Sequence, residues 1–133
     1  MPAVYYVDDS RDDLFYAQYV CRGARDDIDL SCFATSDAAF DALHAAVAEG
    51  LALPALLIVD LYMPLDSGIG LITRLRADRR FSSMRIAVCS GSDATADRER
   101  ALACGADLYV EKPVDLNVLM DIRPSSIEDS RLY

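Results

Sequence analysis

Five polar side chains stand at the ends of four short apolar runs in the chain: Asp8, Asp9, Asp60, Ser90 and Lys112. If these runs are parallel strands, their carboxyl ends meet at one edge of a sheet, where open α/β sheets bind ligands. Three carboxylates at such an edge repel one another unless a cation lies among them. Oxygen ligands in small number suit Mg²⁺, and Mn²⁺ could substitute. A hydroxyl and an ammonium opposite that cation could bind the oxygens of a phosphoryl group.

The run that ends on Asp60 has the strongest pattern. Residues 56–59 are all apolar, and two of them are β-branched, which is typical of a strand buried on both faces of a parallel sheet. A carboxylate needs a partner in an apolar layer, so Asp60 is expected to emerge at the carboxyl end of this strand. Pro64 prevents the strand from continuing, and Ser67 with Gly68 is expected to open a helix. A carboxylate in this place can accept a phosphoryl group as a mixed anhydride.

Strand and helix patterns alternate along the chain. Ser10 is expected to cap the first helix, with Asp12 and Asp13 in its first turn where the helix dipole favours acids, and Ser36 the second. The pattern predicts an α/β protein with a flavodoxin-like, doubly wound, five-stranded parallel sheet in the order 2-1-3-4-5 and five helices. The second strand has the weakest pattern and is expected near an edge of the sheet. The expected strands cover residues 3–7, 28–34, 56–60, 85–89 and 107–110, and the last three helices cover 67–78, 93–104 and 115–122.

Length and composition favour a single soluble domain. The chain has 133 residues, of which 53% are hydrophobic and 26% charged, and its net charge is −9. The negative charge argues against binding to nucleic acid or to an anionic membrane surface, because phosphates would be repelled. The sequence has neither an apolar run near the roughly 20 residues of a membrane span nor the charge pattern of a secretory signal. A cytoplasmic location is therefore expected.

The cysteines and the one histidine carry no recognisable chemistry. Cys21, Cys32, Cys89 and Cys104 are widely spaced, without a CxxC pair or a nearby pair of histidines, which favours four free buried thiols over a zinc site. His44 lies in an alanine-rich helical stretch and is expected to be an ordinary surface or half-buried side chain.

Taken in order, the residues at the strand ends resemble the receiver domain of response regulators in two-component signalling. The resemblance covers about residues 4–122, and the combination of motifs is highly specific. The motifs in this chain are Asp8-Asp9, Asp60-x-x-Met63-Pro64-x-x-x-Gly68, Ser90-Gly91, and residues 105–113, which end in Lys112-Pro113.

The resemblance implies a role for each of these positions. Asp60 would be the phospho-acceptor, and Mg²⁺ would be bound by Asp9, by Asp60, by the backbone carbonyl of Tyr62, and by Asp8 largely through water. Ser90, Gly91 and Lys112 would bind the phosphoryl group. Ser90 and Tyr109 would form the switch, with Tyr109 turning inward as Ser90 is drawn toward the phosphate. The fourth helix, polar and weakly amphipathic, would be the element that moves.

The same resemblance implies the partners. A sensor histidine kinase would donate the phosphoryl group, and a histidine phosphotransfer protein is a further candidate partner. Residues 1–123 are expected to form the receiver, and because only about twenty residues follow Lys112, a stand-alone receiver without an output domain is expected. Pro124 should end the last helix early. Residues 124–133 are expected either to be disordered or to form an arm that joins a homodimer.

Two other classes of function remain open. The chain could be a Mg²⁺-dependent phosphatase with Asp60 as nucleophile, although Tyr62 stands where such enzymes carry a second carboxylate. It could also be a receiver-shaped interaction module that works without phosphorylation, although each chemical position of the family is present. A phosphoryl-accepting receiver that does not turn over substrate fits best. The bulky ring of Tyr62 is expected to hinder water at the acceptor and to slow autodephosphorylation.

Overall fold

The computed structural model describes residues 2–24, 27–63, 67–91 and 95–116. Their centre is a five-stranded parallel sheet in the order β2-β1-β3-β4-β5, which confirms the predicted topology. The weakly patterned second strand lies at one edge, also as predicted. The strands are β1 (Ala3–Val7), β2 (Asp29–Phe33), β3 (Leu56–Asp60), β4 (Ile86–Ser90) and β5 (Leu108–Glu111).

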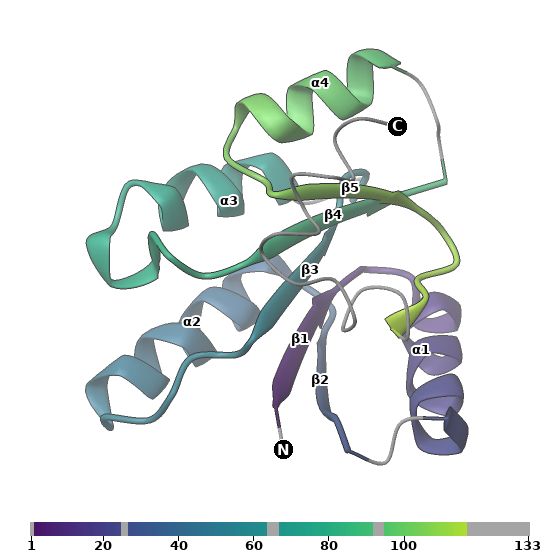
Figure 1. The fold of residues 1–133 in the computed structure, drawn as a ribbon, viewed down its shortest axis with the longest axis horizontal. Coiled ribbons are helices and arrows are strands. Elements are labelled where there is room, and N and C mark those ends of the chain that lie inside the picture. Colours follow the sequence, from purple (N-terminus) through teal and green to yellow (C-terminus); the bar gives the residue numbers. More distant parts are fainter. Residues whose placement is uncertain (1, 25–26, 64–66, 92–94, 117–133) are drawn as a thin grey trace.

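Helices cover both faces of the sheet (Figure 1), as expected of a doubly wound fold. Side chains of α2, α3 and α4 pack on one face, and α1 packs on the other. A short 3₁₀ turn, η1 (Arg79–Phe81), follows α3 and was not predicted. Of the expected last helix, residues 117–122 lie outside the described residues. The helices are α1 (Arg11–Ala24), α2 (Ser36–Ala48), α3 (Gly68–Arg76) and α4 (Thr95–Ala103).

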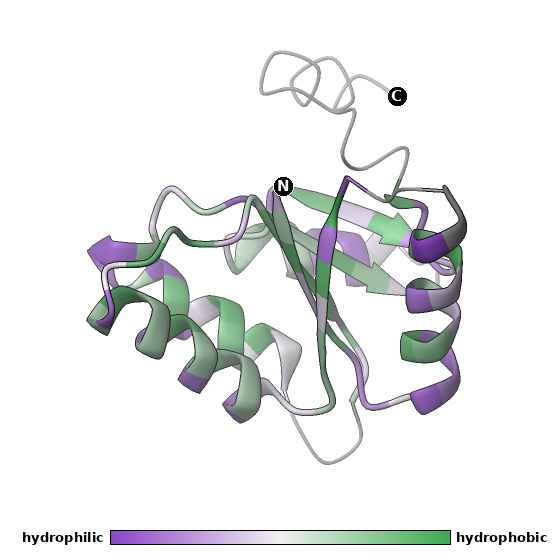
Figure 2. Ribbon diagram, turned by 90° about the horizontal axis from the view of Figure 1, so that it is seen from below, coloured by the Kyte–Doolittle hydropathy of each residue, from purple (hydrophilic) through white to green (hydrophobic). Residues whose placement is uncertain are grey.

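The two central strands explain why the site is held firmly. Every residue of β3 and β4 is buried, because both faces of these strands are covered by helices. Figure 2 shows the sheet largely in hydrophobic colours, with hydrophilic residues mainly along the outer sides of the helices. Asp60 and Ser90 are the last residues of β3 and β4 and are buried with them. Their positions are therefore fixed by the packed core.

Local signals set where the helices begin. The Ser67 hydroxyl accepts a hydrogen bond from the Gly70 N–H at 2.8 Å and caps α3, as predicted. For α2 the predicted cap was wrong. The hydroxyl of Thr35 accepts from the Ala38 N–H at 3.1 Å, and Ser36 is the first helical residue. The Ser36 side chain instead donates to the Ser67 carbonyl, so it links the starts of two helices.

All four cysteines are free thiols, as predicted, but only Cys21 and Cys89 are buried, whereas Cys32 and Cys104 are half-buried. His44 is half-buried too, and its ring lies against Phe40 with 4.2 Å between the centroids, which fits an ordinary packing role.

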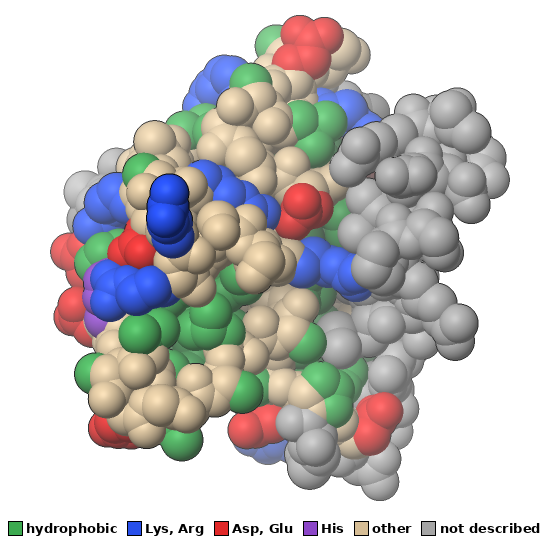
Figure 3. Space-filling model, turned by 60° about the vertical axis from the view of Figure 1, so that its left-hand side comes forward, with side chains coloured by type: hydrophobic (Ala, Val, Ile, Leu, Met, Phe, Trp, Pro, Cys, Tyr) green, Lys and Arg blue, Asp and Glu red, His purple; other side chains and the backbone are tan. Residues whose placement is uncertain are grey.

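Basic side chains gather on part of the surface. The face in Figure 3 carries a group of basic side chains, and the arginines Arg74, Arg79 and Arg80 are exposed on α3 and η1. Within the described part of the chain, every helix is too short or too polar to span a bilayer.

Candidate acidic site at the carboxyl edge of the sheet

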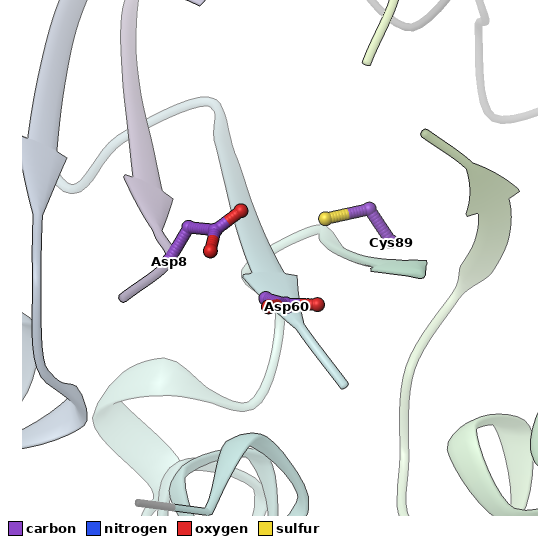
Figure 4. A group of neighbouring side chains, drawn as sticks. All are labelled: Asp8, Asp60 and Cys89. Carbon is purple, nitrogen blue, oxygen red and sulfur yellow. The ribbon is translucent and has the colours of Figure 1, made fainter. Parts of the chain in front are cut away.

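Two carboxylates come together where β1 and β3 end. These strands are neighbours and pair Val7 with Val59. Asp8 and Asp60, the residues that follow this pair in the chain, therefore lie side by side. Oxygen atoms of both carboxylates and the Cys89 sulfur from β4 lie within 4.8 Å of one another (Figure 4). Asp8 is fully buried and Asp60 is 3% exposed. The sheet topology thus places two negative charges in a nearly dry site.

Lys112 supplies the compensating positive charge. It follows β5, and its backbone N–H donates to the Ser90 carbonyl at 2.8 Å, which sets its height at the sheet edge. The Lys112 ammonium lies 2.9 Å from Asp8 Oδ2 and 3.3 Å from Asp60 Oδ2. It lies closest, at 2.7 Å, to Oδ2 of Asp13, a residue of α1. One ammonium therefore contacts three carboxylates.

The charges of the site shift one another's pKa. Burial raises the pKa of Asp60 to about 6, the negative charge of Asp8 adds to the rise, and Lys112 opposes it. Burial lowers the pKa of Lys112, but its hydrogen bonds to Asp13 and Asp8 and the charge of Asp60 outweigh burial and raise the pKa above its ordinary value. Lys112 therefore stays protonated. Its positive charge offsets only part of the free-energy cost of ionising the buried Asp60.

Asp8 is held by three donors. Besides Lys112, the phenol of Tyr6 donates to Asp8 Oδ2 at 2.8 Å, and the Ser10 backbone N–H donates to Oδ1 at 2.9 Å. Tyr6 is buried within β1, so its hydroxyl needs such a partner. These bonds fix the orientation of a carboxylate that the sheet alone would leave free to rotate.

The donor set fits Mg²⁺. Two buried carboxylates that raise each other's energy offer the hard oxygen ligands that Mg²⁺ prefers. Cys89 does not belong to that set, because burial and the negative charge of Asp60 raise the pKa of its thiol to about 12, and a neutral thiol is a poor metal ligand. Asp9 is exposed and lies outside the described group around Asp60. The Tyr62 backbone N–H lies 3.4 Å from Asp60 Oδ1, so Tyr62 adjoins the site.

The predicted phosphate and switch residues lie at the same edge. Ser90 is fully buried at the end of β4, whereas Gly91 is exposed. Tyr109 is only 8% exposed, with the Arg98 guanidinium of α4 5.5 Å from its ring centre. The Tyr109 ring is therefore packed inward in this structure, and the predicted inward turn would have to start from another arrangement. Whether Ser90 and Tyr109 act as a switch stays a prediction.

Four residues of this region were not singled out from the sequence: Tyr6, Asp13, Cys89 and Asp97. From the sequence, Tyr6 is predicted only as part of an apolar run, and Cys89 only as part of another run and as one of the four free thiols. Strand alternation could have found them, because Tyr6 shares the face of Asp8, two residues on. Asp13 had been explained by the helix dipole alone. Nothing in the sequence indicates that Asp97 of α4 meets Tyr62.

The fold and the site define a class of protein, and comparison with known proteins identifies the family. The model of the response regulator receiver domain matches residues 4–123. The chain belongs to this family, whose members are phosphoryl-accepting domains of two-component signalling and bind Mg²⁺ or Mn²⁺ at an acidic pocket. The resemblance inferred from the motifs is thereby confirmed.

The individual relatives differ in how much of their own length this chain matches. Response regulator Rre1 of Synechocystis is 36% identical over 63 residues, 47% of this chain and 27% of that protein. The transcriptional regulatory protein TctD of Salmonella typhimurium is 34% identical over 83 residues, 62% of this chain and 36% of that protein. The chain thus spans about a third of these curated relatives. The crystal structure of the Mn²⁺-bound response regulator Rcp1 has a TM-score of 0.71 at 18% identity and covers 100% of this chain and 94% of that one.

Proposed function

We propose that this protein is a cytoplasmic receiver that takes a phosphoryl group from a sensor histidine kinase onto Asp60 and thereby changes its preference for a protein partner. The observation that carries the proposal is the buried Asp60 carboxylate at the end of β3, with Asp8 beside it and the Lys112 ammonium 3.3 Å away. Of the described carboxylates, only these two share a buried site with a lysine.

The chemistry proposed for Asp60 is nucleophilic. A carboxylate oxygen attacks the phosphorus of a phosphohistidine, the new O–P bond forms a mixed anhydride, and the P–N bond breaks. The imidazole nitrogen keeps the electron pair of that bond and takes up a proton from water. The Lys112 ammonium would then contact a phosphoryl oxygen, and so would the Ser90 hydroxyl after rotation. Gly91, which has no side chain, would contribute only backbone atoms beside Ser90.

The metal assignments rest on the family and on the donor set. Asp9, Asp60 and the Tyr62 carbonyl would hold Mg²⁺ directly and Asp8 largely through water, and Mg²⁺ or Mn²⁺ would neutralise charge on the transferred oxygens. Asp8 is pre-oriented for that role by Tyr6, Ser10 and Lys112. A pKa of about 6 keeps most of Asp60 ionised at neutral pH, as a nucleophile requires.

The proposed response is a shift between two arrangements of the same fold. A phosphoryl group adds about two negative charges and new acceptor oxygens beside Ser90 and Lys112. The described part of α4 contributes only Asp97 and Ala101 to the buried residues, so this helix is weakly anchored and suited to move. Its present contacts through Arg98 to Tyr109 and through Asp97 to Tyr62 would then change.

The partners and the oligomeric state belong to the same proposal. The kinase is the proposed donor, and a histidine phosphotransfer protein could receive the group in a relay. A homodimer is a further proposal, made for residues 124–133, which lie outside the described residues. The negative net charge favours a protein surface over nucleic acid or a membrane as the partner.

The test is the intact mass of the protein after incubation with a small phosphodonor such as acetyl phosphate, with and without Mg²⁺. The wild type and Asp12→Asn, which removes an exposed carboxylate on the outer side of α1, should each gain one phosphate when Mg²⁺ is present. Asp60→Asn should gain none. A wild-type protein that stays unmodified under all conditions would contradict the proposal and favour the interaction module. Gel filtration of the same samples tests for a homodimer.

A further inference from the structure

Lys112 is bound more closely by α1 than by the proposed acceptor. Its ammonium lies 2.7 Å from Asp13 Oδ2 but 3.3 Å from Asp60 Oδ2. Charge-assisted N–H···O bonds are strongest near 2.7 to 2.9 Å, so the contact with Asp13 is the tight one and the contact with Asp60 is slack. The third partner, Asp8, lies at 2.9 Å and is shared with Tyr6.

The start of α1 does not need the carboxylate of Asp13, because Asp12 stands beside it in the first turn. The first turn of α1 contains two adjacent acids, and either one satisfies the helix dipole. Their side chains face different ways: Asp13 turns to Lys112, whereas Asp12 lines a shallow hollow beside Phe15 and Tyr19 on the outer side of α1. Asp12 and Asp13 are therefore a matched pair in which only one acid contacts the site.

Because of the contact with Asp13, the Lys112 ammonium is bound both by α1 and by the two carboxylates at the sheet edge. Asp13 is 41% exposed, whereas the Lys112 side chain is 19% exposed and Asp8 fully buried. The ammonium is thus drawn from the buried pair toward the rim. Without Asp13, only Asp8 and Asp60 would attract it, and it would compete for their oxygens with any metal ion.

We propose that Asp13 is a positioning residue that anchors Lys112 on the α1 side of the site and keeps its ammonium from closing over Asp8 and Asp60. These carboxylates then remain available to Mg²⁺, and Lys112 remains in reach of the phosphoryl group. The inference rests on the proposed function, because it assigns the metal and the phosphoryl group to this edge of the sheet.

The test is the affinity for Mg²⁺, measured by titrating MgCl₂ into the isotope-labelled, unphosphorylated protein and following backbone amide shifts. Asp13→Asn should bind Mg²⁺ about tenfold more weakly than the wild type, at the lower end of the effects of residues behind the metal ligands. Asp12→Asn removes the same charge one residue away and should weaken binding by about twofold or less, because that carboxylate is screened by water. Equal affinities in the two variants would overturn the proposal.

A second comparison separates positioning from general electrostatics. Lys112→Gln removes the competing ammonium, so adding Asp13→Asn or Asp12→Asn to it should weaken Mg²⁺ binding equally. A tenfold effect of Asp13→Asn that persists beside Lys112→Gln would show that Asp13 does not act through Lys112. The amide spectra of all variants report at the same time whether the fold is intact.

The Mg²⁺ titration of the Asp13 variants and the phosphorylation test of the proposed function can fail independently of each other. If the wild type binds Mg²⁺ but never gains phosphate, the phosphoryl-acceptor proposal fails and the Asp13 comparison still gives its own answer. If the wild type gains phosphate while the two asparagine variants bind Mg²⁺ alike, only the inference about Asp13 fails. A wild type that binds no Mg²⁺ at all overturns both.

Discussion

The phenol of Tyr62 donates a hydrogen bond of 2.5 Å to Asp97 Oδ1 and so ties the loop after β3 to α4. The same aspartate lies 3.8 Å from Arg100, and its neighbour Arg98 lies over the ring of Tyr109. The residue two positions after Asp60 therefore has its ring fixed by the helix that we propose to move. Through this contact, phosphorylation of Asp60 would be linked to the position of α4.

The first prediction concerns the lifetime of the proposed aspartyl phosphate. We expect the Tyr62 ring, held by Asp97, to limit the approach of water to Asp60, so Tyr62→Ala should lose its phosphate several-fold faster than the wild type. Tyr62→Phe keeps the ring but loses the tether, and its rate should lie between these two. The measurement is the decay of the phosphorylated mass after removal of the donor. An unchanged lifetime in Tyr62→Ala would contradict the role of the ring.

The second prediction follows from the raised pKa of Asp60. The pKa is about 6 in the folded protein and about 3.9 in an unfolded chain, so the folded state binds this proton more tightly. As pH rises from about 4 to about 6, ionisation of Asp60 therefore costs stability, and the cost stays constant above that range. Asparagine carries no charge and avoids this cost.

Without metal at pH 7.5, Asp60→Asn should raise Tm by about 4 °C or more, a shift of the size that ~1 kcal/mol produces in a domain of this length. The gain should shrink at pH 4, and MgCl₂ should reduce it at pH 7.5 because the cation stabilises the wild type. Thermal unfolding followed by circular dichroism measures each value. A gain that is the same at both pH values would show that the charge of Asp60 is not its cause.

The sequence predicted those residues of the site whose positions follow from the sheet topology alone. Asp8, Asp60 and Lys112 converge because parallel strands end at one edge, and the apolar runs already reveal where these strands end. The contact of Asp13 with Lys112 depends in addition on how α1 is rotated against the sheet. That rotation is set by side-chain packing among distant residues, which hydrophobic periodicity specifies only to the nearest face.

The contact between Tyr62 and Asp97 was beyond prediction for a related reason. It joins a loop to the start of a helix with little apolar pattern, and both positions depend on the loops around them. The cap of α2 shows the same limit on a smaller scale. Thr35 and Ser36 are both good cap residues, and the sequence does not say which of them bonds Ala38.

The third prediction tests how closely α3 approaches the acceptor strand. A Cβ atom added at Gly68 would overlap the backbone carbonyl oxygen of Asp60 and lie 2.9 Å from Val59 Cγ1. Gly68→Ala must therefore push the start of α3 away from β3, at a cost of about 1 to 3 kcal/mol in the free energy of unfolding.

Gly91→Ala is the matched control, because a Cβ at Gly91 would meet nothing within 4 Å. Urea unfolding of both variants should show a clear loss for Gly68→Ala and almost none for Gly91→Ala. Gly68→Ala should also accept phosphate more slowly, since the backbone that carries Asp60 is displaced. Equal stability of the two variants would mean that α3 can move away from the strand freely.

The fourth prediction concerns Arg76, which joins α3 to the starts of β4 and β5. The Arg76 guanidinium donates to the Gly105 carbonyl at 2.8 Å and to the Met84 carbonyl at 2.6 Å, and it pairs with Asp107 at 2.9 Å. Asp107 also accepts the Ile86 backbone N–H at 2.9 Å, so one network holds the start of β4 and the turn before β5. These strands carry Ser90 and Lys112 at their other ends.

Arg76→Met keeps an apolar stem of similar length, but several half-buried carbonyls lose this donor and Asp107 loses its ion-pair partner, keeping only the Ile86 N–H. We expect a loss of about 2 to 3 kcal/mol in the free energy of unfolding. Arg80→Met is the control, because Arg80 pairs with Asp78 at the surface, where water replaces the lost contact at little cost. Urea unfolding separates the two, and a loss as small as that of Arg80→Met would show that water satisfies the Arg76 network equally well. A large loss with normal phosphate acceptance in the remaining folded protein would instead mean that this network stabilises the two strands without setting the geometry of the acidic site.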